Sequence, residues 1–122
     1  MDVKEISRFL DESKEYIARG DAIQASEKLY KAVEECLKAL AGRYRIAEYE
    51  KAKGDGRWSG YLLGQAAGKL SDNLKKKEIE DVWARAFAIH VWGFHEGKYG
   101  IEEVKRSIPY VEWLIDYVKA RT

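Results

Sequence analysis

The sequence is poor in the residues that mark secreted, membrane-spanning and β-rich proteins. Its 122 residues include one cysteine, Cys36, and one proline, Pro109. A single thiol cannot form an internal disulfide and fits a reducing compartment. No run of about 18 apolar residues could span a bilayer, and the amino terminus lacks the charged-then-apolar pattern of a secretory signal. Because β-type alternation is also missing, we expect a cytoplasmic, helical protein with no membrane anchor.

The chain also lacks an excess of charge of either sign. Twenty-two lysines and arginines face 21 aspartates and glutamates, which gives a formal net charge of +1. No overall field therefore attracts nucleic acid or a membrane surface, and any basic binding site must be local. Lysine and glutamate are abundant while methionine and cysteine are scarce, a bias typical of heat-adapted proteins.

What the chain does have is apolar residues at every third or fourth position, which predicts an all-α fold in one domain, residues 1–122. A junction at Gly20 and Asp21 predicts that the first two helices form a hairpin. Pro109 lies inside the last apolar stripe and predicts a kink. A tetratricopeptide-like pair is the rival fold, but no 34-residue repeat is present. We expect an antiparallel bundle of four to five helices, over residues 2–19, 21–53, 58–70, 77–96 and from 100 onward.

Two features predict a symmetric homodimer. The helix over residues 21–53 would be about 45 Å long against about 26 Å for the first helix, so later helices or a second subunit must cover its distal half. Gly60, Gly64 and Gly68 fall four residues apart on one ridge. Each costs about 1 kcal/mol relative to alanine in a helix, which favours close approach by a neighbouring helix. Two-fold pairing is the commonest way to provide such cover.

Arg85 and His90 are the candidate functional pair, because both lie in an otherwise apolar helix. Five residues separate them by about 140° on a regular helix, so both reach one phosphate only if the helix is distorted or the site lies between helices. A structural interpretation competes with this one. His90 would then be a hydrogen-bonded core histidine, and Arg85 would pair with Asp81 one turn earlier.

Metal and thiol chemistry have little support in the sequence. His90 and His95 are five residues apart, unlike the four-residue spacing of metalloprotease helices, and no third ligand is evident. We therefore expect no metal and no cofactor, with His95 placed favourably against the dipole at a helix end. Cys36 lies on an apolar stripe and is expected to be a small core residue.

A cluster of cations forms a second candidate site, for RNA or another single strand. Cations contact phosphates and aromatic rings stack on bases, so their interleaving is typical of single-strand binding. Glu48 and Glu50 dilute the charge, and a solvated helix end is the alternative. The cations are Arg43, Arg45, Lys51, Lys53 and Arg57, and the rings are Tyr44, Tyr49 and Trp58.

The stretch from Arg85 to His90 resembles the Arg-x4-6-His motif of the HEPN superfamily of helical domains. The longer pattern is similar to the crenarchaeal PaREP family of the same superfamily. Catalytic HEPN members often carry a polar residue after the arginine, where this chain has Ala86. The resemblance covers residues 25–41, 58–70 and 83–94, and Val111, Leu114 and Ile115 in the last helix.

This resemblance implies a dimeric bundle in which two Arg85/His90 pairs face each other across a subunit cleft. We expect that cleft to bind RNA or a nucleotide. One alternative is a metal-independent ribonuclease, in which His90 assists the 2′-hydroxyl and Arg85 steadies the phosphate. Another is a non-catalytic protein partner, as in toxin–antitoxin pairs or complexes with a nucleotidyltransferase.

Overall fold

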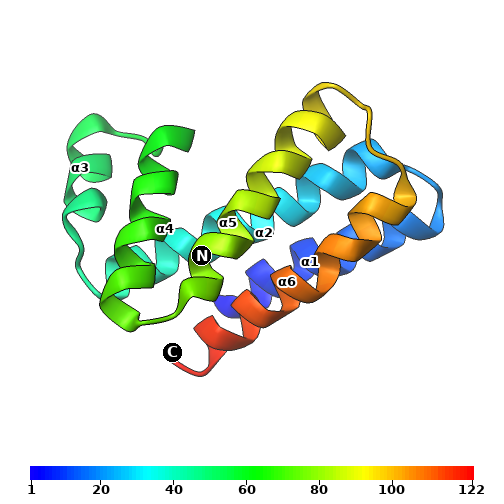
Figure 1. The fold of residues 1–122 in the computed structure, drawn as a ribbon. Helices are drawn as coiled ribbons and strands as arrows, with labels where there is room; N and C mark the ends of the chain where they lie inside the picture. Colours follow the sequence, from blue (N-terminus) through cyan, green and yellow to red (C-terminus); the bar gives the residue numbers. More distant parts are fainter.

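The computed structural model describes the whole chain, residues 1–122, and it is all-helical, with no strand (Figure 1). Six α-helices and one short π-helical segment make up the fold. The helix bounds are α1 Val3–Ala18, α2 Ala22–Arg43, α3 Ala47–Asp55, α4 Gly60–Leu74, α5 Lys77–Ala88, the π-helical η1 Ile89–His95, and α6 Ile101–Lys119.

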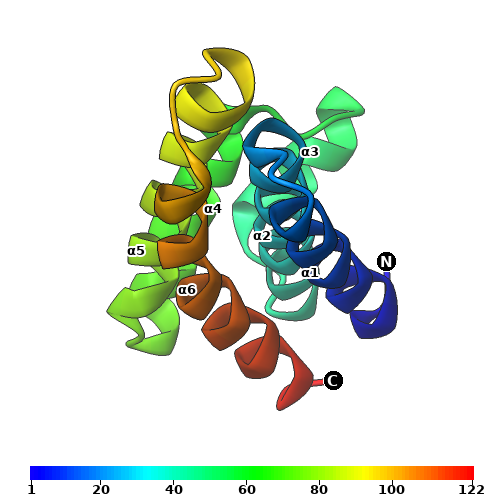
Figure 2. The same cartoon turned by 90° about the vertical axis from the view of Figure 1, so that its right-hand side faces the viewer.

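Short polar side chains start three of the helices. The carboxylate of Asp2 accepts a hydrogen bond from the Glu5 amide at 2.9 Å, and that of Asp21 accepts one from the Gln24 amide at 3.0 Å. Ser59 caps α4 in the same way. Each cap satisfies an amide that has no partner inside the helix. Because Gly20 has a positive φ of 76°, the chain reverses at once, and α1 and α2 form the expected hairpin (Figures 1 and 2).

The second helix is shorter than the sequence predicts, and this break makes six helices rather than four or five. α2 ends at Arg43, and α3 begins at Ala47. Between them Arg45 has a left-handed φ of 49°, and Ile46 turns into the core, where it is only 5% exposed. Gly42 lets the chain fold back, since a Cβ there would lie 2.9 Å from the Tyr49 ring. The predicted continuous helix over residues 21–53 is therefore wrong.

α2 is the central helix of the bundle. It packs against α1, α4, α5, η1 and α6, so later helices of the same chain cover the part that α1 leaves free (Figure 2). Its apolar stripe is fully buried and includes Leu29, Val33, Cys36, Leu37 and Leu40. The overhang that favoured a second subunit is thus absent, so this argument for a homodimer does not hold.

The glycine ridge of α4 meets side chains rather than a helix backbone. A Cβ at Gly64 would lie 3.1 Å from the indole nitrogen of Trp83, and one at Gly60 would lie 3.7 Å from the Phe87 ring. Gly68 has open space beside it. α5 therefore lies against α4 with two aromatic side chains placed over two of the glycines.

The last helix, α6, contains Pro109 and remains one helix from Ile101 to Lys119. A kink at the proline stays a prediction. None of the helices combines the length and apolar character needed to cross a bilayer.

Candidate functional site

The segment that follows α5 has an unusual backbone register. Residues Ile89–His95 form a π-helix, and the Glu96 amide donates to the Val91 carbonyl, five residues back, at 2.8 Å. In this register residues five apart lie nearly one above the other, whereas an α-helix separates them by about 140°. The predicted regular helix over residues 77–96 is therefore wrong over residues 89–95. Such segments are rare and occur frequently at functional sites.

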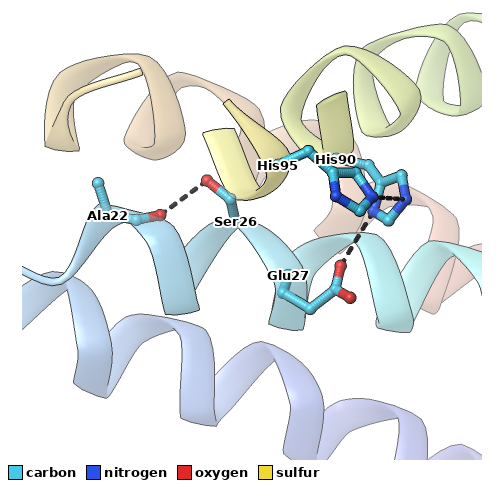
Figure 3. A network of polar contacts seen from close by, with 5 residues as sticks. All are labelled: Ala22, Ser26, Glu27, His90 and His95. Carbon is cyan, nitrogen blue, oxygen red and sulfur yellow. Dashed lines mark hydrogen bonds and ion pairs between the residues drawn. The ribbon is translucent and has the colours of Figure 1, made fainter. Parts of the chain in front are cut away.

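A close contact holds η1 against α2. A Cβ added at Gly93 would lie 2.8 Å from the Cβ of Ser26 and closer still to its hydroxyl oxygen. Ser26 is fully buried, and its hydroxyl donates to the Ala22 carbonyl at 2.7 Å (Figure 3). Only glycine at position 93 allows this approach. The contact fixes the distance between α2 and the segment that carries His90 and His95.

Three side chains form a polar chain at this contact. His90 Nδ1 lies 3.1 Å from Glu27 Oε1, and His90 Nε2 lies 3.1 Å from His95 Nε2 (Figure 3). The side chains of His90 and Glu27 are about one-fifth exposed, at 20% and 22%, while His95 is exposed. The Glu27 carboxylate only accepts hydrogen bonds, so in the neutral imidazole it favours the tautomer with the proton on Nδ1 and the lone pair on Nε2.

Aromatic rings fix the plane of the His90 imidazole. Tyr30 stacks on it with ring centroids 3.9 Å apart, and Phe94 lies parallel on another side at 6.1 Å. Burial raises the pKa of Tyr30 to about 12, with smaller contributions from the negative charges of Glu34 and Glu27. Tyr30 therefore remains neutral at physiological pH and serves as a stacking surface.

Arg85 lies on a different side of α5 and faces α6. Its guanidinium stacks over the Tyr110 ring at 4.3 Å from the centroid. No ion pair joins it to Asp81, so the expected structural pairing is absent. Arg85 and Asp81 both line an open groove of about 480 Å³ between α5 and α6. The remaining lining residues are Ala84, Ala88, Ile89, Tyr99, Ser107 and Tyr110.

The two residues of the motif are therefore not brought together within one chain. Arg85 contacts Tyr110 of α6, whereas His90 contacts Glu27 and Tyr30 of α2. The structure instead joins His90 to His95, a pair whose five-residue spacing on a regular helix is poorly placed for one metal ion. No group of three or more histidine, cysteine or acidic side chains gathers to hold a metal ion.

The predicted basic cluster lies at the opposite end of the molecule from η1, around α3 (Figure 1). Lys51 pairs with Asp55 at 3.5 Å, and Lys53 lies over the Tyr49 ring at 5.5 Å. Arg43 ends α2, Arg45 occupies the break before α3, and Arg57 follows α3. The cluster is thus spread over a helix junction and shares no groove with Arg85 or His90.

Sequence reasoning missed Glu27, Tyr30 and Tyr110. Glu27 is 63 residues from His90 along the chain, and no local pattern distinguishes it from the other half-buried glutamates of α2. Tyr110 follows Pro109, lies outside the predicted apolar stripe of the last helix, and is 40% exposed. Cys36 behaves as expected: it is fully buried, and burial raises the pKa of its thiol.

The sequence profile of the archaeal PaREP1/PaREP8 family matches residues 2–115. The chain belongs to this family. It is similar to a protein from Sulfolobus solfataricus of known crystal structure, at 33% identity over 94% of this chain and 93% of that one, with a TM-score of 0.85. A solution structure of the same structural-genomics target matches at 33% identity over 93% and 87% of the two chains, with a TM-score of 0.81. No curated protein matches. These likenesses support the family and the fold and indicate no function.

Proposed function

We propose that this PaREP1/PaREP8 protein is a HEPN-type helical domain that binds RNA or a nucleotide as a homodimer, in a cleft lined by Arg85 and His90. The observation that carries the proposal is the state of Arg85. Its guanidinium has no carboxylate partner, stacks on Tyr110 and lines an open groove. An arginine in this state keeps its hydrogen-bond donors free for a phosphate.

The groove suits a nucleotide in size and chemistry. Its volume of about 480 Å³ falls in the range of small-molecule sites. Tyr99 and Tyr110 are both in its lining, and aromatic side chains beside a cation are the usual platform for a base and its phosphate. The acidic Asp81 at the same groove would accept hydrogen bonds from a base amine or a ribose hydroxyl.

The directions of the two motif residues support the homodimer part of the proposal. Arg85 faces α6 and His90 faces α2, so one phosphate contacted by both would need side chains from two subunits. A two-fold cleft of this kind is what the HEPN resemblance implies. Sedimentation equilibrium at tens of micromolar is expected to give a dimer, and a monomer at that concentration would remove this part of the proposal.

Fluorescence anisotropy with a labelled single-stranded RNA tests the binding. Arg85→Gln is expected to weaken binding about tenfold to a hundredfold, because it removes a charge-assisted phosphate contact worth about 1.5–3 kcal/mol. It should also make the negative slope of log affinity against log salt shallower by about one. Arg8→Gln, an exposed arginine on α1, is the matched control and should bind as wild type does.

Equal losses in Arg85→Gln and Arg8→Gln would mean that the contact is diffuse charge and not this groove. Binding that is absent in wild type, or that does not depend on salt, would instead favour the protein-partner alternative.

A ribonuclease is the second candidate, favoured by the Glu27–His90 contact of 3.1 Å. A carboxylate that holds one imidazole nitrogen leaves the other free to act as a base on a 2′-hydroxyl. Ala86 is buried, so the residue after the arginine contributes nothing to the groove. RNA cleavage in EDTA should be lost in His90→Gln and reduced in Glu27→Gln. RNA left intact by the wild-type protein would exclude this activity.

A further inference from the structure

We propose that His90 and His95 form a binding site for a divalent transition-metal ion such as Zn²⁺, with Glu27 as the supporting carboxylate. The inference involves the same His90 as the proposed cleft but requires no contact with RNA, and it begins with the distance between the two ring nitrogens. His90 Nε2 and His95 Nε2 are 3.1 Å apart. Two imidazoles that each bind one zinc ion at about 2.0–2.1 Å place their nitrogens about this far apart.

The hydrogen bonds of the pair leave one nitrogen of each ring directed at the space between them. In the neutral imidazole Glu27 favours the proton of His90 on Nδ1, so His90 Nε2 presents a lone pair toward His95. Two facing lone pairs at 3.1 Å would repel each other. A hydrogen carried by His95 therefore lies between the nitrogens in the free protein, and a metal ion that both rings ligate would take its place. Exchange of one for the other needs only a change of tautomer in His95.

Glu27 occupies the place of an outer-sphere ligand. Histidines that bind metals almost always donate their other ring nitrogen to a carboxylate or carbonyl, which orients the ring and raises its basicity. Here the oxygen lies 3.1 Å from Nδ1, and Tyr30 stacks on the same ring at 3.9 Å. The ligand is thus held in place before any ion arrives. Because His95 is exposed, an ion reaches the pair directly from solvent.

The backbone register gives a separate reason to assign a function to the pair. A regular helix would direct residues 90 and 95 about 140° apart, and only the π-helix of η1 places them together. Imidazole nitrogens suit zinc, nickel and copper, and water would complete the coordination because the chain supplies no third side-chain ligand.

Zinc titration by calorimetry, with the full chain free of added chelator, measures the binding. The wild type should bind one Zn²⁺ per His90/His95 pair. His95→Ala, a change at an exposed position, should lower the affinity at least tenfold, and Glu27→Gln about tenfold to a hundredfold. Glu102→Gln, which removes an exposed carboxylate of α6 outside the pair, should bind zinc as the wild type does.

Imidazole NMR gives an independent readout, because the chain contains only two histidines. Saturating Zn²⁺ should shift the Nε2 signals of both rings and leave both protonated at Nδ1. The proposal is overturned if Zn²⁺ leaves either ring unchanged, or if His95→Ala binds zinc as tightly as the wild type.

Discussion

Gly93→Ala is the substitution that tests the geometry of the site most directly. The new Cβ would lie 2.8 Å from the Cβ of Ser26 and nearer to its hydroxyl oxygen, distances that folded proteins do not show. Ser26 is fully buried, and its hydroxyl is held by the Ala22 carbonyl, so it has no room to move aside. Either η1 must separate from α2, or the Ser26 side chain must lose its hydrogen bond to the Ala22 carbonyl.

The expected magnitude is the balance of two opposing effects. Overpacking costs about 1–3 kcal/mol, while alanine gains up to about 1 kcal/mol over glycine in helix propensity. We expect a net destabilisation of about 1–2 kcal/mol, measured by urea unfolding followed by circular dichroism. Because η1 would shift, the same variant should lose the interaction between His90 and His95.

Gly68→Ala is the matched control, since it makes the same chemical change in a helix with nothing within 4 Å of the new Cβ. It should stabilise the protein by up to about 1 kcal/mol. Ser26→Gly removes both clashing atoms, so it should cost less in the Gly93→Ala background than alone, with a coupling of about 0.5–3 kcal/mol. The close contact between η1 and α2 would be refuted if Gly93→Ala were as stable as the wild type and showed no coupling.

Three further predictions concern stability and accessibility. The folded state keeps Tyr30 protonated up to about pH 12 while the unfolded chain ionises from pH 10.0, so stability should fall as pH rises through this window. Thermal melts should show a shallower fall in Tyr30→Phe, and equal slopes would contradict the prediction. Cys36 should react with a thiol reagent only upon unfolding, because burial protects it and raises its pKa; rapid labelling of the native protein would count against this. Arg45→Gly should raise the free energy of unfolding by up to about 1 kcal/mol, since glycine tolerates the φ of 49°, and an unchanged urea midpoint would show otherwise.

Local chemistry made much of the fold predictable. The caps at Asp2 and Asp21 depend on side chains three residues from the amides they bind, so a sequence pattern is sufficient to find them. The apolar stripe of α2 was predicted for the same reason, and it is buried as expected. The break after Arg43 was not predicted, because neither glycine nor proline stands in it. Burial of Ile46 and packing of Tyr49 on Gly42 set it, and both are tertiary contacts.

The candidate site was predictable in its residues and not in its arrangement. Arg85 and His90 were found because charged groups are rare in that apolar stretch. Their partners were not, since Glu27 and Tyr110 come from helices whose positions depend on the whole fold. Apolar residues at every third or fourth position also give no sign that the helix changes register at Ile89.

One spacing has two opposite outcomes in this chain, and the backbone register decides between them. Arg85 and His90 are five residues apart, and so are His90 and His95. Most of the stretch from Arg85 to His90 belongs to α5. Arg85 faces α6, and His90 faces α2. The stretch from His90 to His95 lies within η1, where hydrogen bonds span five residues and the ring nitrogens come within 3.1 Å. The close contact of Gly93 with Ser26 allows η1 to pack tightly against α2. Gly93 thus helps to determine that His90 can act with His95 and not with Arg85.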